Sequence, residues 1–100
     1  MSIQSLAVEI HETAKSKGFW DDEVGPNFVL AKLALIASEV SEVLEAYRKE
    51  QGAEAIAVEF ADIIIRTLDL YVGLQEAGVI PTGLEIDSVL ALKTSGNKER

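Results

Sequence analysis

AVEFADIIIRTLDL, residues 57–70, is the stretch that decides the fold of this chain. Its apolar side chains would cover nearly every side of a helix, and such a helix needs cover on more than one side. We therefore expect a helix over residues 53–77, ended by Gly78, that packs against neighbouring helices. In a domain of 100 residues, a second subunit is expected to supply part of that cover.

Outward from this stretch, apolar periodicity predicts three more helices. Spacing of i, i+3, i+4 and i+7 indicates a helix over residues 2–17, and a helix over residues 26–49 begins with a proline. Thr82 and Glu85 fit a capping box, which predicts the last helix over residues 83–94. No alternation typical of strands is present. The expected fold is therefore an all-α, four-helix bundle-like domain.

Composition excludes several classes of protein. The 100 residues predict one domain, 1–100, and 48% of them are hydrophobic, enough for a core. The absence of cysteine excludes disulfides and thiolate metal sites, and the single histidine, His11, excludes a di-iron bundle with two Glu-x-x-His motifs. A net charge of −8 argues against binding to nucleic acid or to an anionic membrane.

The chain shows no targeting or membrane signal. No apolar run approaches ~18 residues, the length of a spanning helix. MSIQSLAVEIHE, residues 1–12, lacks the basic region and long apolar run of a signal peptide. We therefore expect a cytoplasmic protein.

Two pairs of acidic residues suggest chemistry. Glu39 and Glu42 lie three residues apart, as do Glu59 and Asp62, and residues at this spacing share one side of a helix. Four acids close together in apolar helices would be costly unless a cation neutralises them. Oxygen ligands of this kind suit Mg²⁺, with Mn²⁺ as a substitute. The pairs therefore predict a metal site between two helices.

A purely structural role for the acids is the alternative. Most helical glutamates are solvated, and the Glu-x-x-Glu pattern is common. Arg66 lies one turn after Asp62 and could form an i, i+4 ion pair with it. Asp69, three residues later, would complete a structural Asp–Arg–Asp ladder.

Here the sequence resembles a known family. ALIASEVSEVLEAYRKE, residues 34–50, followed by AVEFADIIIRTLDL, is similar to the MazG-like members of the all-α nucleoside triphosphate pyrophosphohydrolases. HETAKSKGFWDDE, residues 11–23, and the pattern of Lys93, Asn97 and Arg100 extend the resemblance over nearly the whole chain.

The resemblance implies an enzyme. It implies that Glu39, Glu42, Glu59 and Asp62 hold Mg²⁺ and act in catalysis, and that a nucleoside triphosphate is hydrolysed to the monophosphate and pyrophosphate. Two features depart from the family pattern. Ser38 stands where many members have a further Glu, and many members continue past the final Arg with a basic tail.

The resemblance also implies substrate contacts. Lys93, Asn97 and Arg100 match residues that contact substrate in relatives. Trp20 is either a hydrophobic plug over the end of the bundle or a surface on which the nucleobase stacks. His11 is expected to be structural or at the rim of the site, with a role as general base as the alternative.

Three functions follow as hypotheses. The first is a Mg²⁺-dependent nucleoside triphosphate pyrophosphohydrolase that forms a homodimer or homotetramer. The second is a narrower enzyme, specific for dUTP or dCTP or for phosphoribosyl-ATP. The third is a non-catalytic helical assembly module that keeps its acids for ion pairs.

Overall fold

The computed structural model describes residues 1–99, and within them the chain is entirely helical and loop. Its helices are α1 (Ile3–Ser16), α2 (Pro26–Arg48), α3 (Ala53–Glu76) and α4 (Ile86–Lys98). Four helices with no strand among these residues confirm the predicted all-α class, and the arrangement is compatible with a helical bundle.

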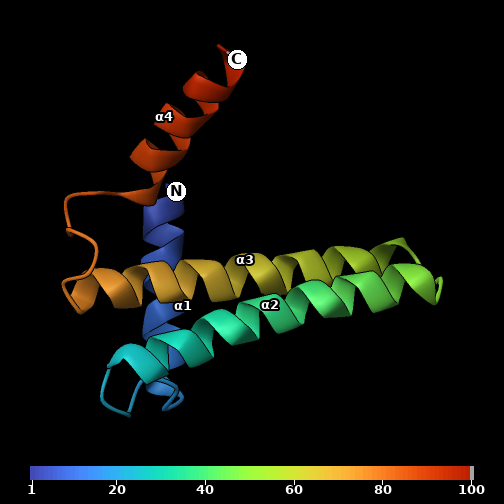
Figure 1. Ribbon diagram of the computed structural model, residues 1–100, viewed down its shortest axis with the longest axis horizontal. Helices are drawn as coiled ribbons and strands as arrows, with labels where there is room; N and C mark the ends of the chain where they lie inside the picture. Colours follow the sequence, from blue (N-terminus) through green and yellow to red (C-terminus); the bar gives the residue numbers. More distant parts are fainter. Residues whose placement is uncertain (100) are drawn as a thin grey trace.

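α2 and α3 form a helical hairpin, α1 packs on α3, and α4 contacts α1 (Figure 1). α2 and α3 run antiparallel and lie side by side along most of their length. α1 crosses α3 near the end of the hairpin where α3 finishes. α4 starts near the beginning of α1 and points away from the hairpin, with its main contacts to α1.

Local sequence explains the start of three helices. The Ser2 side chain accepts a hydrogen bond from the Ser5 backbone N–H at 3.0 Å, and the Ser2 N–H donates to the Ser5 hydroxyl at 3.1 Å, which caps α1. Pro26 occupies the first turn of α2, where its missing N–H costs nothing. Gly52 precedes α3 with φ of 100°, a conformation that favours glycine.

The prediction for the last helix was wrong at both ends. α4 begins at Ile86 rather than at residue 83, and it continues to Lys98 rather than to residue 94. Glu85 is the N-cap and makes no side-chain capping bond, so the predicted capping box with Thr82 is absent. The reason is tertiary: the Leu84 carbonyl accepts hydrogen bonds from the Tyr71 hydroxyl at 2.8 Å and the Gln75 amide at 3.1 Å, which holds the turn against α3.

Polar groups attach α4 to α1. The Asp87 carboxylate accepts hydrogen bonds from the backbone N–H groups of Ile3 at 2.9 Å and Gln4 at 2.8 Å, at the start of α1. The Gln4 side chain accepts from the Ile86 N–H at 3.0 Å and donates to Gln75 on α3 at 2.8 Å. Asp87 therefore satisfies N–H groups that no turn of α1 can reach.

The hydrophobic core is small and lies where α1 crosses α3. Ala7, Leu68 and Val72 form its buried centre, and Leu6, Ile10 and Ile86 pack around them. The buried apolar side chains that α1 contributes are small, Ala7 and Ala14.

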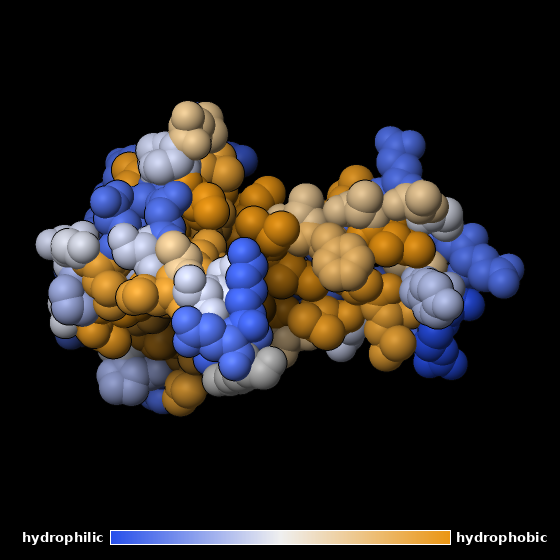
Figure 2. Space-filling model, turned by 90° about the horizontal axis from the view of Figure 1, so that it is seen from above, coloured by the Kyte–Doolittle hydropathy of each residue, from blue (hydrophilic) through white to orange (hydrophobic). Residues whose placement is uncertain are grey.

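Much apolar surface remains exposed. Figure 2 shows apolar side chains over much of the hairpin when the molecule is seen from above. Phe60 is 53% exposed and Tyr47 is 73% exposed. The other large apolar side chains exposed on the hairpin are Leu30, Leu33, Leu35, Val40, Leu44, Val58, Ile64 and Ile65. A surface of this extent is rare on monomers. No helix within residues 1–99 is long and apolar enough to cross a membrane.

Candidate metal centre

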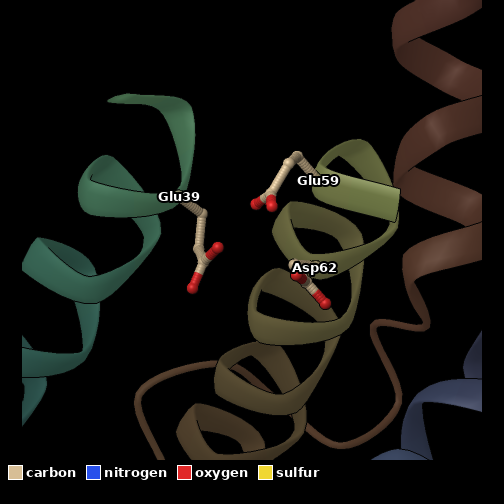
Figure 3. Close-up of side chains that lie close together, drawn as sticks. All are labelled: Glu39, Glu59 and Asp62. Atoms are coloured by element: carbon tan, nitrogen blue, oxygen red, sulfur yellow. The ribbon is translucent and has the colours of Figure 1, made fainter. Parts of the chain in front are cut away.

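Three carboxylates meet between α2 and α3. Glu39 on α2 and Glu59 on α3 extend into the space between the two helices, and Asp62 lies next to Glu59 on α3 (Figure 3). One carboxylate oxygen from each residue lies within 4.8 Å of the others, and all three residues are half-buried. The antiparallel hairpin brings them together because each residue sits on the side of its helix that faces the other helix. We call these three residues the carboxylate cluster.

Glu42 stays outside this group. Its side chain is exposed, and its oxygens are not among those that lie within 4.8 Å of one another. It is still close enough to act on Glu59. Burial raises the pKa of Glu59, and the negative charges of Asp62, Glu42 and Glu39 raise it further. The structure thus brings three of the four predicted acids together and leaves the fourth beside them.

Arg66 pairs with a different acid from the one predicted. Its Nε donates to Glu39 Oε1 at 2.8 Å, across the two helices. In the part of the chain that the structure describes, Asp62 has no ion pair, and Asp69 is bound by other residues. The predicted Asp62–Arg66–Asp69 ladder is therefore wrong, because the Arg66 side chain crosses to α2 instead of lying along α3.

The donor set of the carboxylate cluster fits a hard divalent cation. Mg²⁺ binds oxygen at about 2.1 Å, so two of its ligand oxygens lie at most about 4.2 Å apart. The three oxygens lie within 4.8 Å of one another, close to this range. Across residues 1–99, no side chain donates a hydrogen bond to Glu59 or Asp62. Their charges are therefore available to a cation.

A pocket of about 470 Å³ opens beside the cluster. Glu39 and Asp62 lie at its acidic edge, and Lys17 and Arg66 also line it. Its apolar lining comes from Leu6, Ile10, Ala14, Phe19 and Ile65. Pockets of about 300–1,000 Å³ hold small-molecule ligands, so this one has the size for a nucleoside.

Trp20 lies against α3, outside this pocket. Its indole N–H donates to Asp69 at 2.9 Å, and its ring contacts the ring of His11 edge-on with 4.7 Å between centroids. It also packs on Gly73 so closely that a Cβ there would lie 2.0 Å from the indole. These contacts fit the structural alternative for Trp20, and base stacking stays a prediction.

His11 is buried, with 1% of its surface exposed. Its Nδ1 lies 2.7 Å from Asp69 Oδ1, and its Nε2 lies 3.1 Å from Glu76 Oε2. Both contacts join α1 to α3, which fits the expected structural role. Sequence reasoning missed this use of Asp69, because its partners are 58 and 49 residues away along the chain.

The predicted residues of the last helix do not reach the cluster within one chain. Lys93 and Asn97 are exposed on α4, which points away from the hairpin (Figure 1). Arg100, the third residue of that pattern, lies outside the described residues.

Comparison with known proteins adds no relative. No protein-family model, no curated protein and no solved structure matched this chain.

Proposed function

We propose that the chain is a Mg²⁺-dependent nucleoside triphosphate pyrophosphohydrolase of the MazG-like type. One observation carries the proposal: three half-buried carboxylates from two helices converge, Glu39 and Asp62 among them line a nucleoside-sized pocket, and two of the three have no hydrogen-bond donor among the described side chains. A structural role would leave them with partners, as the fold does for Asp69.

In this proposal the acidic residues of the site have separate roles. Glu39, Glu59 and Asp62 hold Mg²⁺ or Mn²⁺, which when bound stabilises charge on the phosphates. Glu42 remains outside the ligand group and is free to orient the attacking water. The apolar wall of the pocket accommodates the base, so that the triphosphate points toward the carboxylate cluster.

The proposed enzyme is a homodimer or homotetramer. The exposed apolar side chains of the hairpin support this, because a second copy would cover them. A second copy would also be the source of Lys93 and Asn97 for the substrate, since α4 points away from its own cluster. Light scattering at micromolar concentration tests the assembly, and a monomer would contradict it.

The test of function is release of pyrophosphate from a panel of canonical and modified nucleoside triphosphates with Mg²⁺ or Mn²⁺. We expect release by the wild type and by Glu45→Gln, since Glu45 pairs with Arg48 and Lys49 on the outer face. We expect none from Asp62→Asn. Activity confined to dUTP, dCTP or phosphoribosyl-ATP would favour the narrower enzymes.

A non-catalytic assembly module is the second candidate. The apolar surface of the hairpin favours it, because that surface calls for a partner whether or not the chain is an enzyme. An oligomer that neither releases pyrophosphate nor binds Mn²⁺ would establish this candidate and overturn the first.

A further inference from the structure

Arg66 occupies a position that the proposed hydrolysis does not yet explain. Its guanidinium is paired with Glu39, which is also a member of the carboxylate cluster. The Glu39 side chain is 15% exposed and the Arg66 side chain is 44% exposed, so Glu39 is held in place while Arg66 remains free to turn. Arg66 is the cation that the described chain places directly on the cluster.

The charges explain why the pair forms. The three carboxylates carry a charge of −3, and Arg66 reduces it to −2. A divalent cation on Glu39 would supply the same neutralisation at shorter range, and two cations on one carboxylate repel each other. Entry of a divalent ion therefore weakens the hold of Glu39 on Arg66.

The surroundings of Arg66 show where it can turn. It lines the 470 Å³ pocket beside the cluster and also a neighbouring pocket of about 270 Å³, so its head lies between two open spaces. Among the contacts of residues 1–99, only its Nε is bound, through Glu39. The remaining N–H groups of a guanidinium form a planar fork that matches phosphate oxygens.

We infer that Arg66 is the phosphate-binding residue of this pocket: it is paired with Glu39 before the metal binds, and the divalent ion releases it to a phosphate of the ligand. This inference rests on the proposed function, because it requires a metal on Glu39. It adds a binding group that comes from the same chain as the cluster, whereas Lys93 and Asn97 would come from a second copy.

The test compares wild type, Arg66→Gln, Arg66→Lys and the control Arg48→Gln, which removes an exposed arginine paired with Glu45. Calorimetry measures binding of Mn²⁺ alone and then of inorganic pyrophosphate to the Mn²⁺-loaded protein. In Arg66→Gln we expect Mn²⁺ to bind about two- to fivefold more tightly, because the competing cation is gone. We expect pyrophosphate to bind about tenfold or more weakly, because a charged hydrogen-bonding group is lost.

The two opposite changes distinguish this role from a structural one, which would weaken both. Arg66→Lys keeps the charge, so Mn²⁺ affinity should return to the wild-type value while pyrophosphate binding is only partly restored. The inference is overturned if Arg66→Gln binds both ligands as Arg48→Gln does, or if pyrophosphate binding is unchanged. Absence of Mn²⁺ binding to the wild type would overturn the proposed function itself and this inference with it.

Discussion

Asp62 and Asp69 lie two helical turns apart on α3, but they differ in their hydrogen-bond partners. Asp69 accepts hydrogen bonds from the His11 ring and the Trp20 indole, at 2.7 and 2.9 Å. Asp62 has no such donor in the described chain and faces two other carboxylates. Both are acids in an apolar helix, so residue type alone does not separate them. Their hydrogen-bond partners distinguish them. An acid whose carboxylate accepts hydrogen bonds from the fold stabilises the structure, and an acid without such donors is a candidate for binding a ligand.

The polar contacts around Asp69 continue to Glu76 through His11. Each ring nitrogen of His11 faces a carboxylate, and both contacts are hydrogen bonds only if the ring carries two protons. Burial alone would raise the pKa of Glu76, but the Lys15 ammonium and the His11 ring hold it below its ordinary value. At the α1–α3 crossing the carboxylates thus face Lys15 and the His11 ring, whereas in the carboxylate cluster three acids lie together and Arg66 is the cation that residues 1–99 place on them.

The largest expected effect separates the two aspartates by stability. Asp69→Ala removes one of the two carboxylates that face buried His11 and the acceptor of the Trp20 indole N–H, and each buried donor left without an acceptor costs about 1–3 kcal/mol of unfolding free energy. Asp62→Ala removes a charge from a repulsive group and should cost little. Urea unfolding of both variants measures the difference, and equal losses would abolish the distinction.

The second effect separates them by chemistry. Asp62→Asn should abolish pyrophosphate release, because changing a residue that only supports a metal ligand already costs about 10–100-fold in metal affinity or activity. Its melting temperature should stay equal to that of the wild type or rise. A lower melting temperature together with lost helical signal would instead give Asp62 the structural role of Asp69.

The third effect uses the metal as the missing partner. A cation that binds only the folded chain stabilises it by mass action, by about 1.4 kcal/mol at ten times its dissociation constant. Millimolar Mg²⁺ or Mn²⁺ should therefore raise the melting temperature, and Na⁺ at matched ionic strength should not. Glu59→Gln should reduce the response and Glu45→Gln should keep it. Equal responses in these two variants would mean that the cation acts by screening.

The smallest effect concerns Asp87, whose carboxylate, like that of Asp69, accepts hydrogen bonds within the fold. Hydrogen bonds from the N–H groups of Ile3 and Gln4 lower its pKa. A lowered pKa in the folded chain means that its contribution to stability is complete above the ordinary value, about 4, and is lost as the pH falls through the folded value.

Melting curves between pH 6 and pH 3 measure this contribution. The wild type should exceed Asp87→Asn in stability at pH 6, and the gap should narrow as the pH falls toward 3. Glu54→Gln, which removes an exposed acid from the first turn of α3, is the control and should show a smaller change. A gap independent of pH would show that the Asn amide, rather than loss of charge, is responsible.

Local patterns were enough to predict the four helices and three members of the carboxylate cluster. The pairing of Glu39 with Glu59 and Asp62 follows from i, i+3 spacing on two consecutive helices, which a short connection brings together. The predictions that were wrong involved contacts between distant segments. Asp62 lies one turn before Arg66 on the same helix, but Arg66 forms its ion pair with Glu39 on α2.

The same limit explains the error at the last helix. Thr82 and Glu85 had the spacing of a cap, but Tyr71 and Gln75 on α3 hold the Leu84 carbonyl. Asp87 lies in the first turn of α4, but its carboxylate accepts hydrogen bonds from the N–H groups at the start of α1. No pattern in neighbouring residues encodes such a choice, because the competing donors come from other helices.

The packing of Trp20 gives this protein an internal optical probe. It is the single tryptophan of the chain, and its indole contacts His11, Asp69 and Phe28 without itself lining the pocket beside the carboxylate cluster. Its fluorescence therefore reports the state of the α1–α3 crossing. Emission should shift to longer wavelength when Asp69→Ala loosens that crossing, and it should stay constant while a divalent ion is titrated. Folding of the α1–α3 crossing can thus be followed in an unlabelled sample without interference from metal binding.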